Sequence, residues 1–499
     1  MLDDKTKIST TTKILKLLEE KSVDFFHSPQ RTLYAKVPLK GVKWVLEIGS
    51  EGFADYLQRL AYKELEKSLR PTQVEEITAV CRSKALYDGE ERRVFIRTAP
   101  YKAGSPFEGI EIDLGDDTGQ CVRITKGEIR LTEPSVEFFR PDNFQPLPRP
   151  SEEGSLRQLF DFVNVTNPEQ QIAVMAFMVA AAFPEADDYP LLFLTGEQGA
   201  GKSFATELIA SIIDPRTSTR KAMPRSEQDI AIIAARSHLM AFDNLSYLKT
   251  DVADILCRIS TGGSFETRKL YSNTGVTEIN IKKPVILNSI VDLMSRPDVV
   301  QRTFIVELES IAADTRKVAS ELRAEFERDR PEIFGGLCRA LQKALGRYSS
   351  VKIEKTLRLA GAAKLAAAAS PAFDSDADAT VKALIDIQGR QKQTLIAVNP
   401  VCQAIAHLMD DHQVTKVMTP TDLYNALTSS FNQEANPKPN DWPRTVSAFG
   451  KELQRQTDNL RSIDIEVGFK RSGTARMITL TRKSPPEITE ITARVSAAA

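Results

Sequence analysis

The chain has 499 residues, of which 42% are hydrophobic and 27% charged, so it is long enough for about three domains with ordinary cores. Lys and Arg total 66 against 67 Asp and Glu, so any basic surface must be local. The five cysteines form no C-x-x-C pair and the four histidines complete no zinc spacing, which excludes those frameworks and favours a reduced, cytoplasmic location. The polar N-terminus is unlike a signal peptide. The longest apolar run, residues 172–183, is too short to span a bilayer and predicts a core helix, so no membrane partner is expected.

Residues 1–145 predict an α+β module that binds a protein partner or forms a ring collar. Hydrophobic periodicity and turn residues predict helices over 10–21, 51–69 and 71–83, a hairpin over 25–37, and strands over 93–98, 109–114, 120–125 and 128–131. Four acidic residues there are interpreted as turn and strand-edge residues rather than as a metal site: Glu111, Asp113, Asp116 and Asp117.

A proline-rich joint at residues 141–150 separates this module from the rest of the chain. The predicted parts that follow are an ATPase core over 146–312, a helical region over 313–397 and a small domain over 398–483. Residues 484–499 are predicted to be a disordered tail.

Residues 196–203 carry the pattern GxxxxGK[ST] between an apolar run at 191–195, which predicts a buried strand, and a helical run. Such a loop turns consecutive backbone N–H groups and a helix N-terminus toward phosphates. Lys202 would supply charge for the β- and γ-phosphates, and the Ser203 hydroxyl would ligate Mg²⁺. The sequence therefore predicts an ATP and Mg²⁺ site. The predicted nucleotide contacts are Gly196, Glu197, Gln198, Gly199, Ala200, Gly201, Lys202, Ser203 and Phe204.

Residues 238–243 supply a second predicted strand, which ends in a carboxylate. Asp243 is the expected second ligand position for Mg²⁺. The next residue is Asn244, which can orient a water molecule but cannot take its proton. Catalysis would then use Asp243 with a carboxylate from elsewhere, or turnover would be slow.

Two further apolar strands carry candidate catalytic residues. Asn288 ends the run at 284–288, where an amide can contact the γ-phosphate or the attacking water. Arg302 begins the run at 303–308, from which an arginine can reach the γ-phosphate of a neighbouring subunit.

Between these strands, an Asn-Thr-Gly turn at 273–275 predicts a β-hairpin flanked by basic residues, including Arg268 and Lys269. Such a hairpin could project into a central pore and contact a phosphate backbone. An edge hairpin with solvated charges is the equally weighted alternative.

In this order, the motifs resemble superfamily 3 helicases of the AAA+ class, especially the primase-helicase type replication ATPases of viruses, phages and mobile elements. The resemblance covers about residues 190–308. It implies that Arg268 and Lys269 lie at the base of a DNA-contacting hairpin, that Asn288 is the nucleotide sensor and that Arg302 is an arginine finger. Two features depart from the family: Asn244 replaces an acidic residue, and residues 1–145 lack a primase carboxylate triad.

The C-terminal domain predicts three helices and a basic-tipped hairpin, which together make a winged helix. Residues 441–483 hold nine Lys and Arg against five Asp and Glu. A protein-interaction winged helix is the alternative to a DNA-binding one. The predicted DNA contacts are Arg444, Lys451, Arg455, Lys470 and Arg471.

These expectations combine into an ATP-dependent DNA helicase or translocase of phage or mobile-element type, assembled as a ring, expected to be a hexamer. Its fold class is an α/β P-loop AAA+ core with an α+β N-terminal module and a C-terminal winged helix. Two alternatives stay open. One is an ATP-switched replication initiator or loader without processive unwinding; the other is a protein-remodelling or regulatory AAA+ ATPase of a mobile-element or antiviral-defence system.

Overall fold

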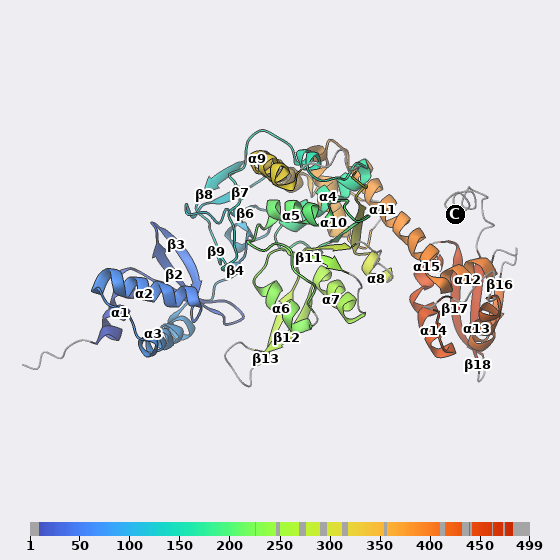
Figure 1. Cartoon of the computed structure of the whole chain (residues 1–499), viewed down its shortest axis with the longest axis horizontal. Helices are drawn as coiled ribbons and strands as arrows, with labels where there is room; N and C mark the ends of the chain where they lie inside the picture. Colours follow the sequence, from blue (N-terminus) through green and yellow to red (C-terminus); the bar gives the residue numbers. More distant parts are fainter. Residues whose placement is uncertain are drawn as a thin grey trace, which may run out of the picture. The chain divides into compact units, whose positions relative to one another are not determined.

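The computed structural model describes most of the chain in two compact units. One unit is built from Met1–Val291 and Arg302–Ile385, and the other from Asp292–Gln301 and Asp386–Ala499. Figure 1 shows the order of the elements. The predicted division into five parts stays a prediction. The described residues are 9–224, 226–245, 250–268, 276–289, 297–311, 318–353, 357–409, 415–431, 439, 442–461, 463–472 and 475–482.

The chain begins with a three-stranded antiparallel sheet, in the order β1-β2-β3, beside three helices. The Ser9 and Ser50 hydroxyls accept the backbone N–H of Thr12 and Phe53, which fixes the starts of α1 and α2. The β1–β2 hairpin and the three predicted helices are confirmed, except that α2 ends at Leu65 rather than at 69, because Glu66 takes a left-handed conformation with φ of 53°. Strand β3 was not predicted. The elements are α1 (Thr10–Glu20), β1 (Asp24–His27), β2 (Leu33–Leu39), β3 (Val42–Glu47), α2 (Glu51–Leu65), α3 (Pro71–Ser83) and the π-helix η1 (Lys84–Asp88).

A second antiparallel sheet, in the order β5-β6-β7-β8, follows with a short parallel pair, β4 and β9. The predicted strand at 93–98 is broken at Arg97, whose φ is 69°. The elements are β4 (Val94–Phe95), β5 (Thr98–Pro100), η2 (Tyr101–Ala103), β6 (Ile110–Asp113), β7 (Cys121–Ile124), β8 (Ile129–Thr132) and β9 (Glu137–Phe138).

Two of the four acidic residues in this sheet are not solvated edge residues, and that interpretation was wrong for them. Glu111 and Asp113 are buried, and each lies 2.6 Å from an arginine, Arg123 and Arg140 respectively. Asp116 does serve the turn, because its carboxylate accepts the backbone N–H of Thr118.

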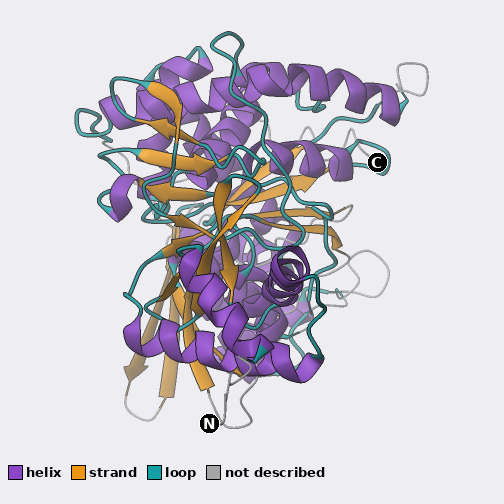
Figure 2. Ribbon diagram, turned by 90° about the vertical axis from the view of Figure 1, so that its left-hand side faces the viewer, coloured by secondary structure: helices purple, strands orange, loops and turns teal. Residues whose placement is uncertain are grey.

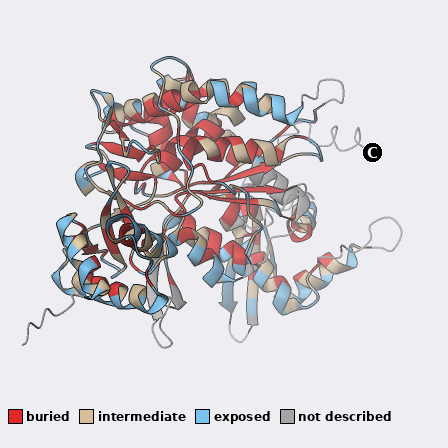
Figure 3. Ribbon diagram, turned by 60° about the vertical axis from the view of Figure 1, so that its left-hand side comes forward, coloured by how far each residue is buried: buried red, intermediate tan, exposed pale blue. Residues whose placement is uncertain are grey.

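A four-stranded parallel sheet, in the order β11-β14-β10-β15, forms the centre of this unit. Its strands are apolar runs that are largely buried, as expected of a parallel sheet covered on both faces. Helices surround the strands (Figure 2), and burial concentrates on the sheet and on the helices against it (Figure 3). The strands are β10 (Leu191–Thr195), β11 (Met240–Leu245), β14 (Val285–Ser289) and β15 (Thr303–Glu307).

The predicted core helix is confirmed as α4 (Pro168–Ala182), in which every side chain from Ala173 onward is buried. The Asn167 side chain caps its start. The other elements here are η3 (Leu156–Asp161), α5 (Lys202–Ile213), α6 (Glu227–Ala235), α7 (Thr250–Thr261), β12 (Gly263–Arg268), β13 (Val276–Ile281), α9 (Ala319–Arg347), α10 (Ala360–Ala369) and η4 (Ser370–Phe373). Helix α11 (Ala377–Val398) begins in this unit and ends in the other.

The other unit contains a three-stranded antiparallel sheet, in the order β16-β18-β17, and helices around one apolar core. Leu423, Phe449, Leu453 and Ile478 are buried in that core. No helix within the described ranges has the length and apolarity needed to cross a membrane. The elements are α8 (Pro297–Val300), α12 (Pro400–Leu408), β16 (Thr415–Met418), α13 (Pro420–Ser429), α14 (Val446–Arg455), α15 (Thr457–Arg461), β17 (Ile465–Ser472) and β18 (Ala475–Arg482).

A buried arginine joins the second antiparallel sheet to the central one. The Arg97 side chain is wholly buried, and its Nε lies 3.1 Å from the carboxylate of Asp214, which follows α5. Its Nη2 donates to the Gln145 carbonyl at 2.7 Å, and its guanidinium lies 3.6 Å from the centre of the Phe144 ring. Burial alone would raise the pKa of Asp214, but the charges of Arg216 and Arg97 hold it well below its ordinary value.

We expect Arg97→Ala to lower the free energy of unfolding of this unit by about 3–5 kcal/mol, because it removes one of the two arginines that pair with the buried Asp214 carboxylate. Asp117→Ala is the control and should cost less than about 1 kcal/mol, because the Lys40–Asp117 pair is exposed. Urea unfolding followed by Trp44 fluorescence, in a Trp442→Phe background, measures both. Equal losses would contradict the role given to Arg97.

Acidification should weaken the same region through His238. Its ring is buried and Nε2 lies 2.7 Å from the Ala181 carbonyl oxygen; burial lowers the pKa of His238 to about 4 from 6.5. Between those two values the unfolded chain binds a proton that the folded chain does not. The free energy of unfolding therefore decreases as the pH is lowered through that window, by up to about 1.4 kcal/mol per pH unit. His238→Gln should flatten the pH dependence of the urea midpoint between pH 6.5 and about 4; an unchanged slope would contradict this.

Candidate functional site

The predicted phosphate loop lies between β10 and α5, as the sequence indicates. Gly196 has a φ of 138°, and a Cβ there would lie 2.5 Å from the Leu308 carbonyl oxygen, so only glycine fits beside β15. Gly201 precedes α5 with a φ of 87°, which turns the chain into the helix. Close packing against Leu308 therefore explains Gly196, and the left-handed turn into α5 explains Gly201.

Lys202 is buried within this loop. Its Nζ donates to the carbonyl oxygens of Gly196 and Glu197, each at 2.7 Å, and burial lowers its pKa. Glu197, Gln198 and Gly199 are exposed, whereas Ala200 is buried. The loop thus holds an ammonium group beneath an exposed run of backbone.

Phe204, in the first turn of α5, is half-buried. The Arg323 guanidinium lies 5.2 Å from the centre of its ring. A cation therefore already faces this ring.

Asp243 meets the phosphate loop at the end of β11. The Ser203 hydroxyl donates to its Oδ1 at 2.8 Å. Burial works to raise the pKa of Asp243, but hydrogen bonds from Ser203 and Asn288 and the charge of Arg220 hold it below its usual value. An ionised carboxylate beside a hydroxyl, next to the predicted phosphate loop, suits Mg²⁺, which takes few protein ligands. The part of the chain that the structure describes has no cluster of three or more His, Cys, Asp and Glu side chains suited to a metal.

Arg220 is a residue of this site that the sequence reasoning missed. Its Nη1 lies 2.5 Å from Asp243 Oδ2, and its Nε lies 3.7 Å from Glu207 on α5. Backbone hydrogen bonds of Lys221 with Ala241 and Asp243 hold this segment against β11. Arg220 lies in no motif and in no predicted element, so no sequence signal identifies it.

Asn244 occupies a bulge of β11, where the register with β14 shifts between Phe242 and Leu245. Its φ is 55°, its side chain is exposed, and its N–H donates to Asn288 Oδ1 at 2.8 Å. Asparagine tolerates this left-handed conformation better than glutamate does. The backbone thus gives a conformational reason for Asn244.

Asn288 is buried, with 1% of its surface exposed, and it links the two central parts of the site. Besides accepting from Asn244, it donates from Nδ2 to Thr206 Oγ1 at 2.8 Å, and that hydroxyl donates to the Lys202 carbonyl at 2.9 Å. Thr206 is a second residue that the sequence reasoning missed. Asn288 therefore couples the Asp243 strand to the helix of the phosphate loop, and its contact with a γ-phosphate stays a prediction.

Arg302 lies at the other edge of the sheet from the phosphate loop. Strands β10 and β15 are parallel with Leu191 opposite Thr303, so Arg302 precedes its strand while Gly196 follows its own. Five residues of strand separate these edges by about 17 Å. Arg302 therefore does not join the other predicted catalytic residues within one chain.

The predicted DNA contacts divide between the two units. Arg268 ends β12 opposite Val276, but its side chain lies outside the described residues, as does Lys269 altogether. In the other unit all five predicted cations are exposed, and Arg471 stands directly opposite Arg476 across the β17–β18 hairpin. Those five are Arg444, Lys451, Arg455, Lys470 and Arg471.

Two protein-family models match parts of this chain. Residues 156–388 match the actinomycete integrative conjugative element replication protein, and residues 401–494 match the AICE RepA C-terminal domain. No curated protein matches. Three apo structures of the NrS-1 C-terminal region align with 95% of this chain and 100% of theirs, at 10–11% identity. Their TM-scores of 0.41, 0.38 and 0.41 are too low to support an argument about the fold.

Asn288→Ala should lower the free energy of unfolding by about 1–3 kcal/mol, because it removes a buried amide that accepts from the Asn244 N–H and donates to Thr206. Asn164→Ala is the matched control, since Asn164 donates to the Glu309 carbonyl at the surface. Urea denaturation measures both. If the two substitutions cost the same, Asn288 is not the link described here.

Proposed function

This chain is a replication protein of a mobile element, and we propose that it is an ATP- and Mg²⁺-dependent motor that moves on DNA as a ring, with six subunits the expected number. In this proposal the parallel sheet is a P-loop AAA+ core of the superfamily 3 type. The 398–483 region is a winged helix that orients the duplex.

The hydrogen bond between Ser203 and Asp243 is the observation that carries the proposal. It places a hydroxyl and an ionised carboxylate together at the start of the phosphate-loop helix. In the proposed complex, the loop N–H groups and Lys202 bind the phosphates of ATP, and Ser203 and Asp243 hold Mg²⁺. The metal would neutralise charge on the phosphate oxygens. Arg220 would exchange its contact with Asp243 for the phosphates.

The location of Arg302 supports an assembly rather than an isolated subunit. Because it lies at the sheet edge away from its own phosphate loop, any contact it makes with a γ-phosphate must be with a neighbour's. Arginine in this role stabilises transition-state charge.

The exposed cations of the C-terminal unit support a DNA contact. Arg471 and Arg476 are like charges directly opposite each other, an arrangement that is unfavourable without an anion nearby. The order is α12, β16, α13, α14, α15, β17 and β18. The winged-helix interpretation takes α12, α13 and α14 as its three helices and β17–β18 as its hairpin, with the five-residue helix α15 between them.

A second candidate is an ATP-switched initiator or loader that does not unwind DNA processively. The exposed, left-handed Asn244 favours it, because no carboxylate stands at that position to activate water. Slow hydrolysis without strand separation would select this candidate.

Steady-state ATP hydrolysis with and without single-stranded and duplex DNA tests the proposal. DNA should stimulate hydrolysis; Lys202→Ala should reduce it to background, and Arg302→Ala should reduce it by roughly 10³-fold. An equimolar mixture of the two variants should recover part of the activity, because each supplies the group that the other lacks.

Arg59→Gln on α2 is the control, since its side chain is exposed and lies outside the site. Hydrolysis that is slow and indifferent to DNA would contradict the motor. Stimulation by a protein but not by DNA would select a protein-remodelling ATPase instead.

A further inference from the structure

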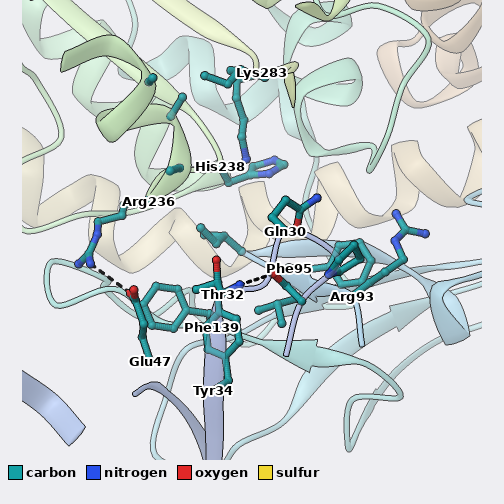
Figure 4. A pocket seen from close by; sticks show the side chains of 18 of the residues that line it. Gln30, Thr32, Tyr34, Glu47, Arg93, Phe95, Phe139, Arg236, His238 and Lys283 are labelled. Carbon is teal, nitrogen blue, oxygen red and sulfur yellow. Dashed lines mark hydrogen bonds and ion pairs between the residues drawn. The ribbon is translucent and has the colours of Figure 1, made fainter. Parts of the chain in front are cut away.

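A cavity of about 1570 Å³ lies between the N-terminal β1–β3 sheet and the central sheet region. Figure 4 shows Lys283 and His238 on one side of it and Tyr34 and Phe139 on the other, with Arg236 and Arg93 at opposite ends. The cavity is separate from the phosphate loop, because no residue of 196–203 lines it. It is large enough for a ligand of several rings.

One wall of the cavity is aromatic. Tyr34 stacks on Phe26 at 5.6 Å between ring centres, and Phe139 lies 5.8 Å from Tyr34. Phe95, which is half-buried, carries the Arg93 guanidinium 4.9 Å from its ring centre. Flat rings bordered by arginine suit the faces of nucleobases.

The Lys and Arg side chains that line the cavity outnumber the carboxylates that line it. Glu47 pairs with Arg236 at 3.2 Å, and Glu185 pairs with Arg93. Both lining carboxylates therefore already have arginine partners. The structure shows no ion pair, among the residues that it describes, for the other four lining cations: Arg31, Arg82, Lys282 and Lys283.

Lys283 is a second indication that the cavity suits an anion. Burial lowers its pKa to about 8, although the charge of Asp214 opposes this. Asp214 already pairs with Arg97 and Arg216, so it is not free to compensate Lys283. A phosphate in the cavity would favour the charged form of Lys283.

The cavity also reaches the base of the β12–β13 hairpin. Thr261 and Gly262 precede β12, Ile281 ends β13, and Lys282 follows it; all four line the cavity. The cavity therefore adjoins the base of the hairpin that is the predicted DNA contact of this unit.

We propose that this cavity binds a segment of single-stranded nucleic acid, with phosphates at Arg31, Arg82, Lys282 and Lys283 and bases against the wall of Tyr34, Phe95 and Phe139. The inference rests on the proposed function, since a motor on DNA must hold a strand beside the hairpin that is predicted to contact it. An acidic polypeptide would pair with the cations, but it has no bases to stack on the aromatic side chains.

The test uses the full chain and a fluorescein-labelled oligothymidylate in fluorescence anisotropy at several salt concentrations. The cavity variant is Arg31→Asn with Arg82→Gln; both side chains are exposed, and asparagine tolerates the φ of 60° at position 31. The negative slope of log affinity against log salt should become shallower by about 1.4, because two phosphate contacts are lost. Arg59→Gln with Lys63→Gln, exposed on α2, is the matched control and should leave the slope unchanged.

Photocrosslinking of a bromodeoxyuridine-substituted strand gives a second measurement, and crosslinks to residues 28–34 or 93–98 are expected. An unchanged slope without such crosslinks would overturn the inference, even where DNA still stimulates ATP hydrolysis and the motor stands. A reduced slope with crosslinks but without stimulation would leave the inference standing and contradict the motor. The inference would also be overturned if polyglutamate, added at the same total charge as the strand, abolished the crosslinks. Absence of any strand binding would overturn it as well.

Discussion

The buried contact between Arg97 and Asp214 holds the larger unit together. It joins residues separated by 117 positions, and the same carboxylate accepts the backbone N–H groups of His238 and Leu239 just before β11. Asp214 also ends the helix that the phosphate loop begins. The position of that helix is therefore fixed at its far end by this ion pair and near its start by Asn288. The proposed nucleic-acid cavity adjoins the same contact, because its lining includes Ile96 and Thr98, on either side of Arg97 in sequence, and His238, whose N–H donates to Asp214.

The local parts of the candidate site were predictable from sequence, and the parts that join distant segments were not. Residues 196–203, Asp243 and Asn288 each follow an apolar run whose length and composition predict a buried strand, so their common sheet edge could be inferred. Arg220 reaches Asp243 from a segment without periodicity, and Thr206 is one helix residue among many. Their roles come from hydrogen bonds that only the folded chain reveals. The same reason explains the error at Glu111 and Asp113, since a strand-edge pattern does not show which arginine will cover a carboxylate.

Asn244 illustrates how a backbone requirement can alter the interpretation of a motif. From sequence it is a missing acid, and its effect on catalysis is its only evident meaning. In the structure it forms a left-handed bulge whose N–H binds Asn288. A glutamate there would be strained by about 1 kcal/mol or more. The link between β11 and β14 therefore accounts for asparagine at position 244. Slow catalysis is not needed to explain it.

The location of Arg302 bears on why this fold would need assembly at all. A single chain gathers Lys202, Ser203, Asp243 and Asn288 at one sheet edge and keeps Arg302 at the other. If the proposed contact between subunits holds, each phosphate site is complete only when two chains meet, and hydrolysis then depends on protein concentration. The proposed nucleic-acid cavity is lined by residues of one chain and carries no such requirement. Strand binding would therefore precede assembly at low concentration, so that the ring forms where the strand already is.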